Sequence, residues 1–139
     1  MKPAERFRAL RVRAEGEAAQ PVSLSVAELT PGELVIRIAY SGLNYKDALA
    51  VTGRDRILRR FPLVPGIDLA GTVVASASPA FAVGDAVLVT GGGLGEECDG
   101  GFAEYARVPA DIAVPIPEVL TLRDAMILGT AGFTASLAL

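Results

Sequence analysis

The sequence predicts a mainly β domain, built as a small barrel or sandwich. Several short segments alternate apolar and polar residues, as half-buried strands do. Turn signals rich in glycine and proline separate these segments. The 15 glycines and 9 prolines among 139 residues also disfavour a helical bundle.

The expected strands follow one another along most of the chain. The segment 34–40 has the clearest alternation, with Leu34, Ile36, Ile38 and Tyr40 on one face. The other expected strands lie at 7–13, 22–26, 71–75, 86–90, 102–108 and 112–116.

The stretch 41–74 concentrates the residues that could carry chemistry, and it begins with a predicted short helix. Asn44 is a strong N-cap, Asp47 suits the third helical position, and Gly53 suits the C-terminal end. One interpretation makes Asn44 and Asp47 capping residues only. The other places Asn44 and Tyr45 at the edge of a pocket, with side chains that hydrogen-bond a substrate carbonyl or a nicotinamide ribose.

Two further features of this stretch each allow a structural and a functional interpretation. The segment 54–60 carries four arginines, which form either a solvated turn or a clamp for the phosphates of a coenzyme A thioester or NADPH. Asp68 lies in an apolar run, so we expect it to be buried with a partner, either Lys46 or one of these arginines. That pair would be structural, or Asp68 would orient a lysine, a tyrosine or a ribose hydroxyl.

A glycine-rich segment at 91–101 is predicted to be a mobile surface loop. It does not match a dinucleotide-binding fingerprint, because Glu96 and Cys98 stand where glycine is needed and the nearby acids would repel phosphate. Acids beside Cys98 raise the pKa of a thiol, so a catalytic thiolate is not expected.

The last segment changes character. Thr121 and Asp124 are typical of a helix start, and the residues from Ala125 are almost wholly apolar. Two interpretations remain: a helix docked on the barrel, or the start of a connection into a second domain. The boundary falls at 120/121: we predict a β domain over residues 1–120 and, in the second interpretation, a connecting segment over 121–139.

Composition excludes several classes of site. With no histidine and one cysteine, the chain holds neither a Ser-His-Asp system nor a zinc site made of Cys and His, and no metal site is predicted. A net charge of −3 gives no reason to expect nucleic acid, and the absence of a long apolar run argues against a membrane span. We expect a cytoplasmic protein with a small-molecule substrate.

Five segments together resemble the medium-chain dehydrogenase/reductase superfamily. They read SGLNYKDALAVTG, FPLVPGIDLAGTV, VGDAVLVTG, GGFAEYARVPA and AMILGTAGFTASLAL. They are most similar to its zinc-free quinone oxidoreductase-like branch, and within it to the acrylyl-CoA reductases. The resemblance implies a GroES-like, partly open β-barrel with a few short helices, followed in the family by a Rossmann domain that binds NADPH. The chain is then expected to be the N-terminal part of such an enzyme and inactive alone.

The same resemblance implies the chemistry and the site residues. Zinc-dependent relatives carry cysteine at the position of Asn44 and Gly-His-Glu at 66–68, so a zinc-free reduction of an activated C=C bond is implied, in an enoyl-CoA such as acryloyl-CoA or in a quinone or enone. Tyr45 and Asn44 would donate to the carbonyl or the nicotinamide. Arg59 would bind substrate phosphate or pair with Asp68. Thr130 would lie near the nicotinamide, unless its hydroxyl only bonds its own helix.

Two other functions stay open at this point. The chain could be a non-catalytic GroES-like binding module, or a subunit that acts in trans with a separate nucleotide-binding chain. The apolar segment from Ala125 could also join copies into a homo-oligomer.

Overall fold

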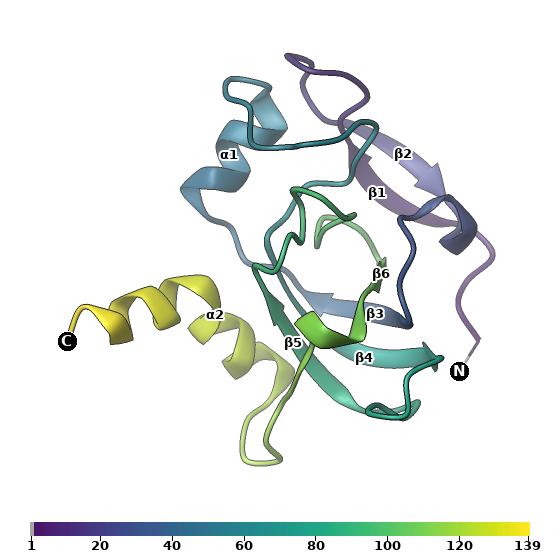
Figure 1. The fold of residues 1–139 in the computed structure, drawn as a ribbon, viewed down its shortest axis with the longest axis vertical. Coiled ribbons are helices and arrows are strands. Elements are labelled where there is room, and N and C mark those ends of the chain that lie inside the picture. The colour runs from purple at the N-terminus through teal and green to yellow at the C-terminus, as the bar shows by residue number, and fades with distance from the viewer. Residues whose placement is uncertain (1) are drawn as a thin grey trace.

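The computed structural model describes residues 2–139 and shows a predominantly antiparallel β domain with two α-helices (Figure 1). Strands β1 (Phe7–Arg11) and β2 (Gln20–Leu24) form a hairpin of their own. A second, five-stranded sheet has the order β6-β3-β4-β5-β7. Its strands are β3 (Leu34–Tyr40), β4 (Asp68–Ser76), β5 (Ala86–Thr90), β6 (Tyr105–Val108) and β7 (Val114–Pro115). The predicted GroES-like, mainly β fold is confirmed.

Strand β4 is the centre of the sheet and is longer than predicted. It pairs with β3 on one side and β5 on the other, and it begins at Asp68 rather than Gly71. Both faces of β4 are covered, which explains why its sequence is nearly continuously apolar rather than alternating. Register shifts between Val35 and Ile36, and between Ile38 and Tyr40, mark irregularities where β3 pairs with β4.

The hydrophobic core has three parts. The largest is formed by the five-stranded sheet and includes Leu34, Ile36, Leu69, Val73 and Val89, each fully buried. A second cluster joins the β1–β2 hairpin to the sheet, with Phe7 and Tyr105 rings 5.3 Å apart. A third cluster includes Ala50 of the first α-helix together with Val12, Leu58 and Leu63. Two 3-10 helices connect strands at the edge of the first two clusters: η1 (Val26–Glu28) and η2 (Ala110–Ile112).

The first α-helix has the predicted boundaries. Helix α1 runs over Tyr45–Thr52, with Asn44 as N-cap and Gly53 after the last residue in a left-handed conformation. The Asp47 carboxylate accepts a hydrogen bond from the backbone N–H of Asn44 at 2.8 Å. Asn44 and Asp47 therefore cap the helix as predicted, but Asn44 is not a capping residue only, because its side chain also bonds Asp68.

The glycine-rich segment 91–101 was wrongly predicted to be a mobile surface loop. Leu94 is fully buried in the main core, and Asp99 is 1% exposed. The two carboxylate oxygens of Asp99 accept from the backbone N–H groups of Thr30 and Val64, both at 2.7 Å. These bonds tie the segment to two distant parts of the chain, which a periodicity argument does not detect.

Helix α2 (Leu122–Leu137) directly follows its predicted N-cap, Thr121. It packs on β4, β5 and β3. Gly129 interrupts it with φ 38° and ψ −152°, so two helical pieces meet at a kink. After the kink the helix extends away from the sheet (Figure 1). Its apolar side chains there are mostly exposed, including Phe133 and Leu137. Within residues 2–139, no helix combines the length and apolar character that a membrane span requires.

Candidate active site

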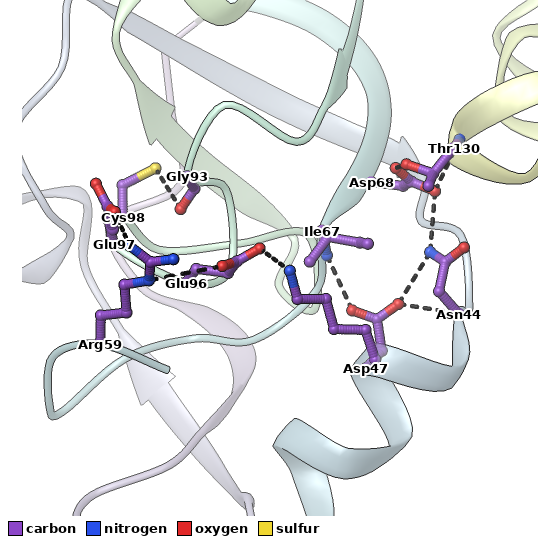
Figure 2. Close-up of polar contacts among 11 residues, drawn as sticks. Asn44, Asp47, Arg59, Ile67, Asp68, Gly93, Glu96, Glu97, Cys98 and Thr130 are labelled. Atoms are coloured by element: carbon purple, nitrogen blue, oxygen red, sulfur yellow. Dashed lines mark hydrogen bonds and ion pairs between the residues drawn. The ribbon is translucent and has the colours of Figure 1, made fainter. Parts of the chain in front are cut away.

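The centre of the candidate site is a pair of buried carboxylates joined by one amide. Asp47 on α1 and Asp68 at the start of β4 are 1% and 2% exposed. The Asn44 side-chain nitrogen donates to Asp68 at 3.0 Å and to Asp47 at 3.1 Å, which uses both of its hydrogens (Figure 2). Asp47 also accepts from the backbone N–H of Ile67 at 3.0 Å. The amide thereby compensates two buried charges that would otherwise repel each other.

Thr130 of α2 completes the environment of Asp68. Its backbone N–H donates to Asp68 Oδ2 at 3.2 Å, and its hydroxyl donates to Asp68 Oδ1. The kink at Gly129 frees this N–H from the helical ladder, and a side chain at Gly129 would come within 3.2 Å of Asp68. The alternative that the Thr130 hydroxyl bonds only its own helix is wrong. Asn44, Asp68 and Thr130 form one network, although 62 residues separate the last two.

A cleft of about 420 Å³ opens beside this network. It lies between the start of α1, the end of β5, the glycine-rich segment and α2. Ile67 and Phe133 contribute apolar surface. Its lining residues are Lys46, Ile67, Thr90, Gly91, Glu96, Thr130, Phe133 and Thr134. An apolar cleft with a few polar groups is the usual form of a small-molecule site.

Among residues 2–139 no ion pair joins Asp68 to an arginine or a lysine, which corrects the predicted ion pair. Lys46 pairs instead with Glu96. Arg59 pairs with Glu97 at 3.1 Å and lies 3.9 Å from Glu96 (Figure 2). The ion pair was a reasonable expectation for a buried acid, but neutral donors satisfy Asp68 here.

The remaining arginines of the 54–60 segment lie on the surface. Arg56 is 3.6 Å from Glu15. Arg54 and Arg60 are exposed, and neither forms an ion pair within the described residues. These two guanidinium groups are therefore available to a phosphate, whereas Arg59 is already engaged.

Tyr45 is the first residue of α1 and projects outward. Its side chain is 81% exposed, beside Leu43, which is 80% exposed. Neither residue packs on the core, because the N-terminus of α1 turns these positions away from the sheet. Tyr45 is not among the residues that line the cleft, although its neighbour Lys46 is. A large exposed aromatic residue is typical of a surface that binds a ligand or another domain.

Cys98 lies in the glycine-rich segment with its thiol half buried, 3.5 Å from the carbonyl oxygen of Gly93. Burial, together with the smaller effect of the Asp99 and Glu97 charges, raises the pKa of this thiol to about 11. A protonated thiol is neither a nucleophile nor a metal ligand at neutral pH.

We expect Cys98 to react slowly with iodoacetamide at pH 8. The two-unit difference between about 11 and the usual 9.0 leaves about 100-fold less thiolate. The greater nucleophilicity of a more basic thiolate recovers about tenfold of this, so a net slowing of about tenfold is expected. The measurement is the alkylation rate of the folded chain between pH 7 and 9.5, with the denaturant-unfolded chain as control. Equal rates in the two states would contradict the raised pKa.

Comparison with known proteins identifies the family. Residues 30–118 match the family model of the alcohol dehydrogenase GroES-like domain. The chain belongs to this family. A probable acrylyl-CoA reductase, AcuI, of Escherichia coli is 52% identical over 83% of the chain and 36% of its own length. A putative quinone oxidoreductase, YhfP, of Bacillus subtilis is 51% identical over 83% of the chain and 35% of its own length.

The solved structures agree with the sequence comparison. The crystal structure of Escherichia coli YhdH with bound NADPH matches the GroES-like chain with a TM-score of 0.87 and 49% identity, over 93% of this chain and 41% of that one. The predicted resemblance to the zinc-free quinone oxidoreductase-like medium-chain reductases is confirmed. The chain spans about a third of the length of the curated relatives it matches. Within residues 2–139, no three His, Cys, Asp or Glu side chains are grouped to hold a metal ion.

Sequence reasoning missed Lys46 and Glu96 as parts of the cleft. Lys46 was considered only as a partner of Asp68, and Glu96 only as a charge that repels phosphate. The missing signal is tertiary, because the loop that carries Glu96 folds back on α1 50 residues earlier in the chain. Two opposite charges that lie 50 residues apart, as Lys46 and Glu96 do, form no local pattern in the sequence.

Proposed function

We propose that this chain forms the catalytic-domain half of an NADPH-dependent oxidoreductase that reduces an activated C=C bond. The substrate is an enoyl thioester such as acryloyl-CoA, or a quinone or enone. The observation that carries the proposal is the Asn44–Asp68–Thr130 network at the edge of the cleft, in a chain whose similar proteins include an acrylyl-CoA reductase and an NADPH-bound structure.

The cleft suits one end of the cofactor. Ile67 and Phe133 offer apolar surface for a flat ring. Tyr45 comes directly before the cleft residue Lys46, and its exposed hydroxyl can donate to a ribose or a carbonyl. When bound, NADPH supplies a hydride. The chain's own residues hold the substrate and shape the wall: Asn44 and Asp68 fix Thr130 at the cleft, and α2 places Phe133 over it. NADPH rather than NADH is part of the proposal.

Two arginines that form no ion pair within residues 2–139, Arg54 and Arg60, favour a coenzyme A thioester as the substrate. Arg54 and Arg60 are exposed and lie before and after Arg59, whose backbone contacts Glu96, so both can bind the phosphates of coenzyme A. Arg59 contributes by holding Glu96 and Glu97 rather than by binding phosphate directly. A quinone would make no use of Arg54 and Arg60.

The domain organisation and compartment belong to the same proposal. Residues 1–120 form the catalytic domain and 121–139 lead toward a nucleotide-binding domain, whose surface would cover Ile127, Leu128 and Phe133. These side chains are more than half exposed and, if uncovered, favour association between copies. The cytoplasm is the proposed location, which the single cysteine of the chain supports.

The test compares the chain alone with a chimera that carries this chain in place of the aligned segment of Escherichia coli AcuI. We expect no NADPH oxidation by the chain alone with acryloyl-CoA or a quinone, because most of a cofactor site would be absent. We expect the chimera to oxidise NADPH with acryloyl-CoA.

Three outcomes decide the matter. Turnover by the chain alone would contradict the need for a separate nucleotide domain. A chimera that folds and binds NADPH but reduces neither substrate would contradict the proposed function and favour a non-catalytic binding module. Activity on mixing the chain with a separate nucleotide-binding domain of AcuI would show that the two parts also work in trans.

A further inference from the structure

The cleft contains few hydrogen-bond donors that are not already used. Reduction of an enoyl thioester at its β-carbon moves negative charge onto the carbonyl oxygen, which then requires donors. Both hydrogens of the Asn44 amide are engaged by Asp47 and Asp68. The hydroxyl of Thr130 donates to Asp68, and that of Thr134 donates to the backbone oxygen of Thr130. The side chains of Asn44, Thr130 and Thr134 are thus occupied, and Tyr45, although exposed, is not among the residues that line the cleft.

Lys46 is the exception. It is the second residue of α1, lines the cleft, and has three N–H donors, of which its one described contact uses a single donor. It is also the only cationic residue among those that line the cleft. The hydroxyl of Thr90 forms no hydrogen bond within residues 2–139, but it is neutral and therefore the weaker candidate.

Glu96 fixes where the Lys46 ammonium lies. The Glu96 side chain is 17% exposed and contacts Lys46 on one side. On the other side the backbone N–H of Arg59 donates to the Glu96 carbonyl oxygen at 2.8 Å, and the Arg59 guanidinium lies 3.9 Å from its carboxylate. A glutamate held from both sides restricts a flexible lysine to one region of the cleft and leaves two N–H groups for a ligand.

We propose that Lys46 is a catalytic residue that binds the thioester carbonyl oxygen and stabilises the enolate, and that Glu96 is its positioning residue. The inference rests on the proposed function. A hydride from the nicotinamide reductant forms the new C–H bond at the β-carbon, and the electrons of the C=C bond move to the carbonyl oxygen beside Lys46. A proton from water then adds at the α-carbon as the carbonyl re-forms. The products are the saturated thioester and the oxidised nicotinamide.

The competing explanation is a purely structural ion pair that fastens the glycine-rich segment to α1. A partly exposed pair contributes little to stability, about 0–1 kcal/mol. The two explanations differ in what Lys46 contacts when substrate is bound. A measurement on the bound substrate, rather than on protein stability, therefore separates the two explanations.

The experiment uses the AcuI chimera with Lys46→Met, Lys46→Arg, Glu96→Gln and Thr90→Val. For Lys46→Met we expect kcat to fall about 100-fold with the KM for NADPH unchanged, as for loss of one oxyanion donor. Lys46→Arg keeps the charge and should retain part of the activity. Glu96→Gln should lower kcat less than Lys46→Met, and Thr90→Val should lower it less than Glu96→Gln, because a neutral hydroxyl is the weaker donor.

A second readout requires no turnover. With NADP⁺ in place of NADPH, an aryl-conjugated enoyl-CoA should show a red-shifted absorbance on binding, because a cation at the carbonyl oxygen polarises the conjugated system. Lys46→Met should abolish the shift, and Lys46→Arg should keep it. This outcome would support Lys46 even if the chimera were inactive, in which case the proposed function alone fails.

An unchanged shift and a kcat within twofold of the parent in Lys46→Met would overturn the inference. Denaturation curves of each variant show whether a loss comes from misfolding. If Lys46→Met is unstable, Lys46→Arg and Glu96→Gln carry the same test. A loss in Thr90→Val equal to that expected for Lys46→Met would assign the role to Thr90 instead.

Discussion

Asp68→Ala is expected to lower the free energy of unfolding of this chain by about 3 kcal/mol. The substitution leaves three donors without an acceptor: one N–H of the Asn44 amide, and the backbone N–H and hydroxyl of Thr130. Each unsatisfied buried polar group costs about 1–3 kcal/mol, and partial access of water limits the total. Urea denaturation followed by circular dichroism measures the change.

Asp68→Asn is the matched control. Its amide oxygen can accept from the two N–H groups that Asp68 Oδ2 now serves, and the Thr130 hydroxyl can accept from the new NH₂ group. We expect a loss of about 1 kcal/mol. If the two variants lost the same stability, the negative charge rather than the hydrogen bonds would be what holds the network.

Asp99→Asn is expected to lower the free energy of unfolding by about 2–3 kcal/mol, more than the same change at Asp68. Both oxygens of Asp99 accept from backbone N–H groups, those of Val64 and Thr30, and these donors cannot reverse their role. An amide can accept only one of these bonds, and its NH₂ group then faces the other N–H. The measurement is again chemical denaturation of the isolated chain.

The control for this position is Asp111→Asn, which makes the same chemical change at an exposed site in η2. We expect it to change the free energy of unfolding by less than about 0.5 kcal/mol. A tolerated Asp99→Asn would mean that the glycine-rich segment is not anchored through Asp99, and that burial of Leu94 holds it instead.

Local sequence signals predicted the elements well. Strands β3 and β5 have the predicted boundaries, because each shows alternation between clear turn signals. Helix α1 begins after Asn44 and ends before Gly53, since capping residues and a left-handed glycine act within one turn of the chain. The resemblance supplied the GroES-like arrangement, which no single strand encodes.

The partners of the buried acids were not predictable in the same way. Asp68 was expected to pair with Lys46 or an arginine, and the structure gives it Asn44 and Thr130. Asp99 was treated as a surface charge and is among the most buried residues. A buried carboxylate needs hydrogen-bond donors, which can come from anywhere in the chain, and distance along the sequence does not indicate which donor it will have.

Four features could be predicted from the residues alone: the fold class, the capped helix at Asn44, the lack of histidine for zinc–histidine chemistry, and the concentration of candidate site residues in 41–74. Periodicity, capping and composition are local or additive properties, so they can be read in order. The folded chain alone shows that Asn44 bridges two carboxylates, that Thr130 reaches Asp68 across a kink at Gly129, and that Lys46 contacts Glu96 at the cleft. These contacts depend on packing β4, α2 and the glycine-rich segment against one another, because burial is what makes each polar group require a partner.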